Sequence, residues 1–219
     1  MFEFKNHQEL TCIADGDGSF FAKAGAMVEY TGNFTAEKVL LDPNQNKSVM
    51  HSLVNLAARK LTGENIPIMK VTGKGKYYMA HSANHVSVIT LNKGQSVSIE
   101  GENLLAFSES CKYSVRFIGS GVLSQKGLFT SSLTAKSEGA QVVITTNGNP
   151  IILKTPCVVD PDAVVCWTGA DAHFKADVSW KTFIGQTSGE SYFMEFNTND
   201  EVVIVQPCER AGGVSVSID

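Results

Sequence analysis

Two stretches of this chain carry one chemical pattern: Ser98–Ser110 reads SIEGENLLAFSES, and Val158–Ala170 reads VVDPDAVVCWTGA. In each stretch two acidic residues flank a turn-forming residue, and an apolar run that ends in an aromatic side chain follows. Glu100-Gly101-Glu102-Asn103 aligns in this way with Asp160-Pro161-Asp162-Ala163. Either paired catalytic carboxylates or a structural corner built twice would produce such a pattern.

The acidic residues of the two stretches are compatible with both interpretations. Residues two apart in an extended strand share a face, so Glu100/Glu102 and Asp160/Asp162 could each present two carboxylates for acid–base catalysis. The same residues favour turns, because Pro presets φ and Asp bonds to its neighbouring backbone. We favour the corner, and expect Leu104/Val164 and Phe107/Trp167 in the core with the acidic residues at the surface.

The similarity extends into the flanking residues. Roughly Gly75–Ser110 repeats as Gly139–Ala170, in the order glycine, strand, hairpin, strand, turn, strand, acidic turn, strand. Duplicated β units usually pack as layers around a common core. We therefore expect residues 1–219 to form a single all-β domain with an internal repeat at about 75–110 and 139–170.

Short β-rich runs separated by Gly, Asn, Asp and Pro predict many strands joined by tight turns, as in a sandwich or barrel. The predicted strands are Ala26–Tyr30, Lys76–Ala80, Val86–Leu91, Ser96–Ile99, Leu104–Phe107, Tyr113–Ile118, Gln141–Thr145, Ile151–Lys154, Val158–Val159, Val164–Thr168, Tyr192–Phe196 and Val202–Gln206. The exception is residues 47–61, where apolar residues recur at helical spacing and predict one short amphipathic helix.

Composition excludes several classes of function. The net charge of −4 gives no general attraction to nucleic acid. The aromatic residues Phe20-Phe21, Tyr77-Tyr78, Trp167 and Trp180 are not interleaved with basic residues, so we expect them in the core or at an interface. No apolar run reaches the roughly 20 residues of a membrane span, and MFEFKNHQEL lacks the pattern of a signal peptide.

The five cysteines form no CxxC pair, which indicates free thiols, and we expect Cys157 and Cys166 to be buried. We expect a cytoplasmic protein.

Three motifs could carry chemistry. His81-Ser-Ala-Asn-His85 has the spacing of two metal ligands on a helix, but its flanks alternate like strands, which predicts a hairpin loop with a histidine at each shoulder. Gly-x-Gly occurs at Gly16/Gly18, Gly73/Gly75 and Gly119/Gly121, but each lacks the third glycine and the helix of a dinucleotide site, so we interpret them as bulge or turn glycines at strand entries. No GxSxG nucleophile motif is present.

Several segments together resemble the altered-inheritance-of-mitochondria family. They are Gly16–Gly32, Leu61–Glu64, Gly101–Phe107, Gly127–Phe129, Val159–Trp167, Ser188–Glu190 and Val202–Pro207, in the family's order. The resemblance implies an antiparallel β-sandwich like that of the tryptophan RNA-binding attenuation protein and no established enzymatic activity. In fungi the family is tied to the mitochondrial inner membrane. Asn197–Asp200 departs from the family, which has glycines there.

These observations lead to three hypotheses of function. The first is a non-enzymatic binding or scaffold protein that supports a protein or membrane-associated assembly. It has an unknown protein partner or forms a homo-oligomer, and it uses no cofactor, metal or nucleic acid. The second is a module that binds a small molecule between sheets or subunits. The third, a hydrolase that uses the acidic pairs or the His81/His85 loop, requires these groups to converge in one cleft.

Overall fold

The computed structural model describes residues 1–39, 67–117, 129–176 and 192–209, and most of these residues lie in antiparallel strands. The strands are β1 (Glu3–Asn6), β2 (Cys12–Lys23), β3 (Met27–Val39), β4 (Ile68–Met79), β5 (His85–Leu91), β6 (Ser96–Ile99), β7 (Leu104–Ser108), β8 (Cys111–Phe117), β9 (Phe129–Ala135), β10 (Ala140–Thr146), β11 (Ile151–Lys154), β12 (Cys157–Val159), β13 (Val164–Thr168), β14 (His173–Ala176), β15 (Tyr192–Phe196) and β16 (Val202–Val205). One 3-10 turn, η1 (Gly101–Asn103), lies between β6 and β7. The predicted all-β antiparallel class is confirmed; the predicted helix at 47–61 lies outside the described residues, as do Gly119/Gly121 and Trp180.

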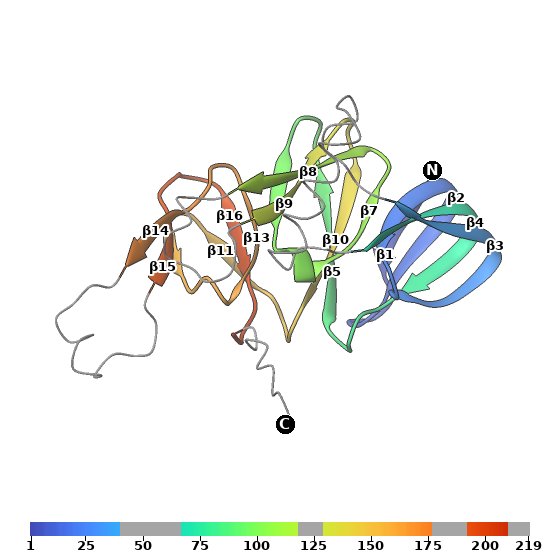
Figure 1. Cartoon of the computed structure of the whole chain (residues 1–219), viewed down its shortest axis with the longest axis horizontal. Coiled ribbons are helices and arrows are strands. Elements are labelled where there is room, and N and C mark those ends of the chain that lie inside the picture. The colour runs from blue at the N-terminus through green and yellow to red at the C-terminus, as the bar shows by residue number, and fades with distance from the viewer. Residues whose placement is uncertain (40–66, 118–128, 177–191, 210–219) are drawn as a thin grey trace, which may run out of the picture.

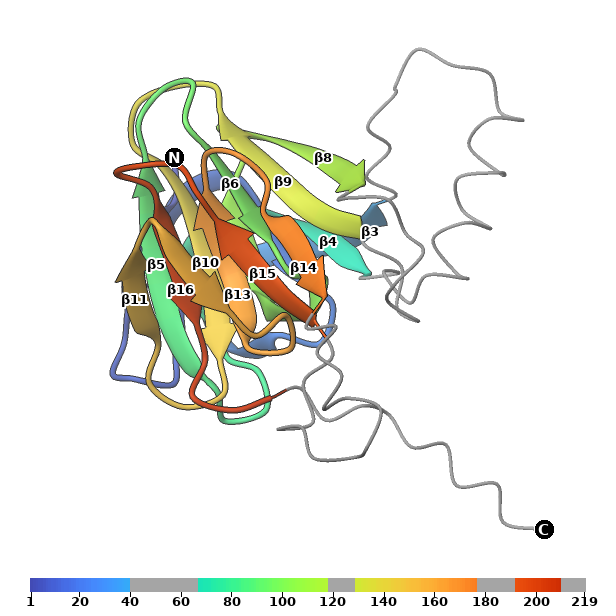
Figure 2. The same cartoon turned by 90° about the vertical axis from the view of Figure 1, so that its left-hand side faces the viewer.

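The strands form three sheets that follow one another along the long axis of the molecule (Figures 1 and 2). Sheet A has the order β3-β4-β2-β7-β10-β5, with β1 added to β2. Sheet B has the order β11-β16-β13-β6-β9-β8, and sheet C has the order β12-β15-β14. The ribbon formed by β2, β4 and β3 lies at one end of the molecule, and β14 and β15 lie at the other (Figure 1).

The same strand order recurs with a shift of six strands. Strands β5-β10-β7 in sheet A correspond to β11-β16-β13 in sheet B, and β6-β9-β8 in sheet B correspond to β12-β15-β14 in sheet C. Each acidic corner carries the chain from one sheet to the next, from β6 to β7 and from β12 to β13. The molecule is therefore layered, with strands β5 to β10 and β11 to β16 in corresponding places.

The predicted repeat unit differs from this arrangement in its first strand. The predicted unit aligns β4 with β10, but β4 lies between β2 and β3, whereas β10 lies between β5 and β7. The connections predicted as hairpins are also different, because β4 and β5 pair with other strands, as do β10 and β11. Local sequence shows that two strands follow one another, but the sheet that each strand joins depends on distant partners.

The central strands β7 and β13 are buried on both faces of their sheets. Eight of their residues are at most 1% exposed: Leu104, Leu105, Ala106, Phe107, Val164, Val165, Cys166 and Trp167. In each run the first and fourth residues enter one hydrophobic cluster, and the second and third enter the cluster on the opposite face. Burial on two sides explains why these strands are continuous apolar runs, and it confirms the predicted core positions of Leu104/Val164 and Phe107/Trp167.

Glycines lie opposite one another in the middle of the ribbon. Gly16 of β2 and Gly32 of β3 are both opposite Gly75 of β4, while Gly18 is opposite Gly73. The φ of Gly75 is +131°, and a Cβ there would lie 2.0 Å from the carbonyl oxygen of Thr31. The prediction that Gly16/Gly18 and Gly73/Gly75 stand at strand entries was wrong, because these glycines lie within long strands and allow close backbone approach at a bend.

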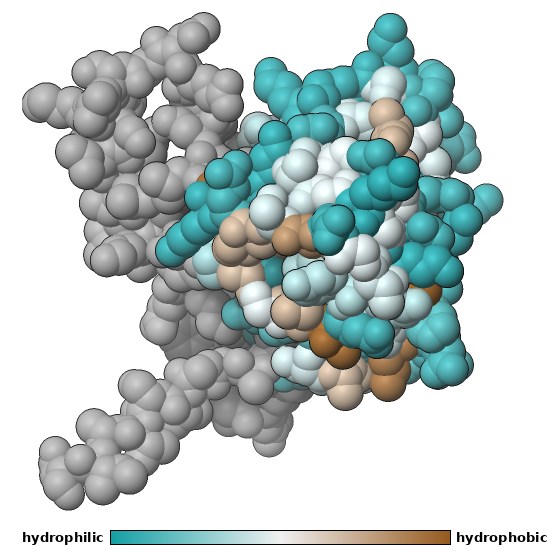
Figure 3. Space-filling view, turned by 90° about the vertical axis from the view of Figure 1, so that its right-hand side faces the viewer, coloured by the Kyte–Doolittle hydropathy of each residue, from teal (hydrophilic) through white to brown (hydrophobic). Residues whose placement is uncertain are grey.

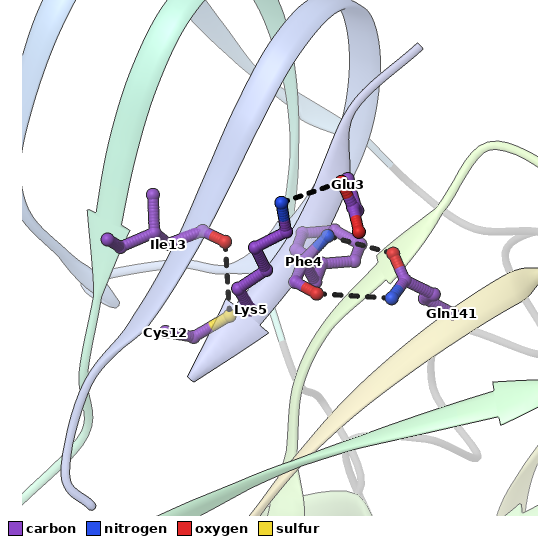
Figure 4. Close-up of polar contacts among 6 residues, drawn as sticks. All are labelled: Glu3, Phe4, Lys5, Cys12, Ile13 and Gln141. Carbon is purple, nitrogen blue, oxygen red and sulfur yellow. Dashed lines mark hydrogen bonds and ion pairs between the residues drawn. The ribbon is translucent and has the colours of Figure 1, made fainter. Parts of the chain in front are cut away.

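The N-terminal strand β1 is attached by a side chain that imitates a strand partner. The amide of Gln141 accepts from the Phe4 N–H (2.8 Å) and donates to the Phe4 carbonyl (3.1 Å), as Figure 4 shows. On its other side β1 pairs with β2 through Cys12 to Asp15. This double attachment places Phe2 and Phe4 over the inner face of the ribbon, where both are buried.

Candidate functional site

The two acidic segments are structural corners. The N–H of Asn103 donates to the carbonyl of Glu100 (2.9 Å), and that of Ala163 donates to the carbonyl of Asp160 (3.1 Å). The Asp160 carboxylate also accepts from the backbone N–H of Asp162 (2.7 Å), which is the local bond that Asp makes in turns. Glu102 is exposed, and Glu100, Asp160 and Asp162 are partly exposed. The turn interpretation of both segments is confirmed.

The two corners are joined through a buried amide. The Asn103 side chain donates to the carbonyl of Thr145 (2.8 Å) and to Oε1 of Gln206 (3.4 Å). The backbone N–H of Gln206 in turn donates to the carbonyl of Ala163 (2.9 Å). Asn103 and Gln206 are 5% and 2% exposed, so these bonds are shielded from water and hold the first corner against the second.

A small cationic cluster forms beside the first corner. The Lys23 ammonium donates to the main-chain carbonyl of Glu102 (3.0 Å) and lies 3.1 Å from Nε2 of His81. Burial lowers the pKa of Lys23, and the nearby Glu102 opposes that change. Burial and the Lys23 charge lower the pKa of His81, again opposed by Glu102. A neutral His81 can accept a hydrogen bond from Lys23, which favours this arrangement at neutral pH.

The histidine loop does not have the geometry of a helical metal site. The N–H of Asn84 donates to the carbonyl of His81 (2.9 Å), which closes a turn between β4 and β5, and β5 begins at His85. Its histidines therefore flank a loop, although the loop is not a hairpin. Within residues 1–39, 67–117, 129–176 and 192–209 no group of three or more His, Cys, Asp or Glu residues could hold a metal ion.

The cysteines are all free thiols. Burial raises the pKa of Cys12 and of Cys166 to about 12, and it also raises the pKa of Cys111 and of Cys157. A thiol with a raised pKa is a poor nucleophile near neutral pH. Cys208 is the exposed one, and its Sγ lies 3.7 Å from the carbonyl of Asn147.

Exposed apolar side chains gather on the ribbon. Met27, Val28 and Tyr30 of β3 are 48%, 63% and 47% exposed. Beside them a hollow of about 340 Å³ is lined by Tyr30, Gly32, Asn33, Phe34, Thr35, Thr72 and Gly73. Figure 3 views the molecule from this end and shows apolar patches between hydrophilic side chains. We call Met27, Val28, Tyr30 and the residues that line the hollow the β3 surface.

Aromatic rings connect the β3 surface to the core. Tyr30 stacks with Tyr77 and meets Phe34 edge to face, with ring centroids 6.1 and 5.5 Å apart. Tyr77 contacts the buried Phe20 edge to face (5.4 Å). The aromatic rings of the ribbon therefore form one connected group, which is buried at Phe20 and exposed at Tyr30.

A second set of exposed apolar residues lies on edge strands β11 and β12. Ile151 and Ile152 of β11 are 45% and 67% exposed, and Val158 of β12 is 56% exposed. Sequence reasoning predicted both strands but did not identify either set as a surface. The sequence prediction placed the end of β3 at Tyr30, although the alternation of side chains continues through Gly32 and Phe34. Lys23 carried no local signal, because its partners lie 58 and 79 residues away.

The geometry defines a class of protein: stacked antiparallel sheets with exposed apolar edge strands. The model of the family described as Mitochondrial biogenesis AIM24 matches residues 2–208, so the chain belongs to this family. No curated protein matches the chain. A protein of known crystal structure from Streptococcus pyogenes is similar to it in fold, with a TM-score of 0.65, 15% identity and coverage of 95% of this chain and 94% of that chain.

Within the described residues no helix has the length and apolar character needed to cross a bilayer.

Proposed function

We propose that the protein is a non-enzymatic binding or scaffold protein that acts with a protein partner. The observation that carries this proposal is the exposure of large apolar side chains on edge strands, with Val28 63% and Ile152 67% exposed. Clustered exposed apolar residues are typical of surfaces that bind other molecules. The layered core supports such a role, because it holds the edge strands in fixed positions.

The arrangement of the reactive side chains also supports a role other than catalysis. Lys23 bonds to His81 and to the backbone carbonyl of Glu102, and the Asp160 carboxylate accepts from the backbone N–H of Asp162 in its own turn. The thiols of Cys12 and Cys166 are buried. These groups serve the fold, so we expect the protein to need neither a metal nor a cofactor. We further propose a cytoplasmic location, which the five free thiols support.

Affinity purification of the full chain from its source organism tests the proposal, with the mass of the intact complex as the readout. A partner should be recovered at fixed stoichiometry. Val28→Asp or Ile152→Asp should abolish its recovery, and Thr90→Asp, at an exposed polar position, should not. A complex that all three variants retain equally would contradict the proposed surfaces.

The hollow on the ribbon favours a second candidate, a module that binds a small molecule. Its lining includes the rings of Tyr30 and Phe34 beside the amide of Asn33, which suits a planar ligand with a hydrogen-bonding group. A thermal-shift screen of metabolites tests this candidate. A true ligand should raise the melting temperature of the wild-type chain and have no effect on Asn33→Ala; a screen without such a ligand would reject it.

A further inference from the structure

Strand β3 is a long edge. Its 13 residues are hydrogen-bonded to β4 and to no other strand in the described part of the chain. Nearly every residue of β3 is exposed, with the apolar Met27, Val28 and Tyr30 among them. A long edge strand with exposed apolar side chains is a template for another strand unless something covers it.

The glycines of the ribbon restrict which strand can be added. Gly16, Gly75 and Gly32 lie side by side across β2, β4 and β3, with φ values of +150°, +131° and +121°. A Cβ at Gly32 would lie 2.1 Å from the carbonyl oxygen of Lys74. On the open side of β3, a strand that extends this glycine row would place a glycine opposite Gly32.

We propose that the β3 surface binds a second copy of this chain, with two β3 strands paired antiparallel about a two-fold axis at Gly32. The axis passes through a residue because opposed residues in an antiparallel pair are both hydrogen-bonded to each other or both not. Gly32 then faces Gly32 of the second copy and extends the glycine row. Sheet A becomes continuous across both copies.

The side chains are self-complementary in this register. Tyr30 lies opposite Phe34 of the second copy, and Phe34 lies opposite Tyr30 of the second copy, so the open side of the aromatic face is covered twice. These are the residues that line the hollow or stand exposed beside it. An isologous contact of this kind closes as a dimer and leaves no further β3 edge.

Charges favour the same register over its neighbour. With the axis at Asn33, Glu29 would lie opposite Glu37 of the second copy. With the axis at Gly32, Glu29 lies opposite Thr35, and Glu37 lies opposite Met27. The β4 residues opposite Thr31, Asn33 and Glu37 in the strand register are all lysines: Lys76, Lys74 and Lys70. In the dimer these lysines would lie beside the carboxylates of both copies.

The oligomeric state of the purified full chain tests this pairing, which does not rest on the proposed function. Sedimentation equilibrium should give twice the chain mass of 23.6 kDa. In the proposed register Thr31 faces Asn33 of the second copy, so T31K/N33K and T31E/N33E should each weaken the dimer by about tenfold or more. An equimolar mixture of the two variants should restore it as a heterodimer.

Thr90→Lys on β5 is the matched control, because Thr90 is exposed on the other edge strand of sheet A. It should leave the dimer intact, and circular dichroism should show that all variants are folded. A wild-type chain that stays monomeric up to about 100 μM, a concentration at which specific pairing is easily seen, would overturn the proposal. So would a dimer that T31K/N33K leaves unchanged.

Discussion

Gln141 and Asn103 show how single residues connect parts of this fold that are distant in sequence. The amide of Gln141 bonds to both backbone groups of Phe4, 137 residues away. The amide of Asn103 bonds to the carbonyl of Thr145, whose hydroxyl donates back to the carbonyl of Asn103 (3.4 Å). In both cases an amide side chain bonds to backbone groups of a distant segment. A substitution of Gln141 or Asn103 to Ala would remove these hydrogen bonds from those backbone groups.

The thiols should react in an order set by their burial. At about pH 8, where an ordinary thiol is partly ionised, a thiol reagent should modify Cys208 first in the native chain. Cys157, whose pKa is raised by partial burial, should follow slowly. Cys12 and Cys166, with pKa values raised to about 12, should react only after unfolding. Mass spectrometry of modified peptides measures this order, and rapid modification of Cys166 would contradict it. Cys208→Ser is the control, because it should remove the first modification seen in the native chain.

His81 should make stability fall at mildly acidic pH. Its pKa is lowered in the folded protein from an ordinary 6.5, so the unfolded chain binds a proton more readily. The stability it contributes is present above about pH 6.5 and is lost as pH falls through the lower folded pKa. Denaturant midpoints at about pH 7.5 and 5.5 measure the change. His81→Gln, which can still accept from Lys23, should reduce this pH dependence, and the exposed control His173→Gln should not; equal profiles for both variants would refute the assignment.

At the scale of elements, the glycine row determines the shape of the ribbon. Strands β2, β3 and β4 each have 12 or 13 residues and would form a flat, long sheet without it. Gly16, Gly32 and Gly75 have φ values that other residues rarely adopt, and they lie where the backbones approach most closely. The inner aromatic face packs against β1 and against residues of β5, β7 and β10 of the same sheet.

Gly75→Ala should be much more destabilising than Gly18→Ala. Both glycines have positive φ, but a Cβ at Gly75 would lie 2.0 Å from the Thr31 oxygen, whereas nothing lies within 4 Å of one at Gly18. Gly18→Ala should cost only the strained backbone, about 1–3 kcal/mol of unfolding free energy. Urea unfolding of the two variants measures the difference. Similar losses would show that backbone conformation, rather than close approach, accounts for the glycine at position 75.

For the whole molecule, shared strands link the three hydrophobic clusters. Strand β7 contributes to the clusters on both faces of sheet A, and β13 does so for sheet B. Loss of packing around β13 therefore exposes residues of two clusters at once. A single domain over residues 1–219 stays a prediction from the sequence, and the shared strands of the described residues are a reason to expect it.

The chain should unfold in one cooperative transition. In a Trp180→Phe variant, Trp167 is the single tryptophan, and it reports the core between sheets B and C. Its fluorescence change should coincide with loss of hydrogen-exchange protection in β2 and β4 at the opposite end. Phe196→Ala, which removes the ring beside Trp167, should lower both midpoints together, with a loss of about 3–5 kcal/mol of unfolding free energy. Ribbon amides that stay protected after the tryptophan transition would instead indicate two domains.

The acidic corners and the strands beside them could be predicted because their signals are local. Turn formers next to continuous apolar runs identified the corners and the limits of β6, β11, β13 and β15. Strands β1, β2, β9 and β14 were missed. In β9 the buried residues are largely hydroxylic, and Thr130 is satisfied by the carbonyl of Ile99 (2.9 Å), a partner that no window of sequence shows. In β2 the residues Asp15 to Gly18 resemble a turn, but pairing with β4 keeps them extended.

The sequence by itself determined the all-β class, the two corners and the residues of the doubly buried strands, because turn propensity and apolar runs act over a few residues. Only the tertiary structure decided which sheet each strand joins, that Lys23 lies within hydrogen-bond distance of His81, and that Tyr30 of β3 is exposed. These depend on contacts between residues that lie far apart in the chain. The exposed β3 edge likewise depends on the position of β4 between β2 and β3, which brings Gly75 beside Gly16 and Gly32 from an earlier part of the chain.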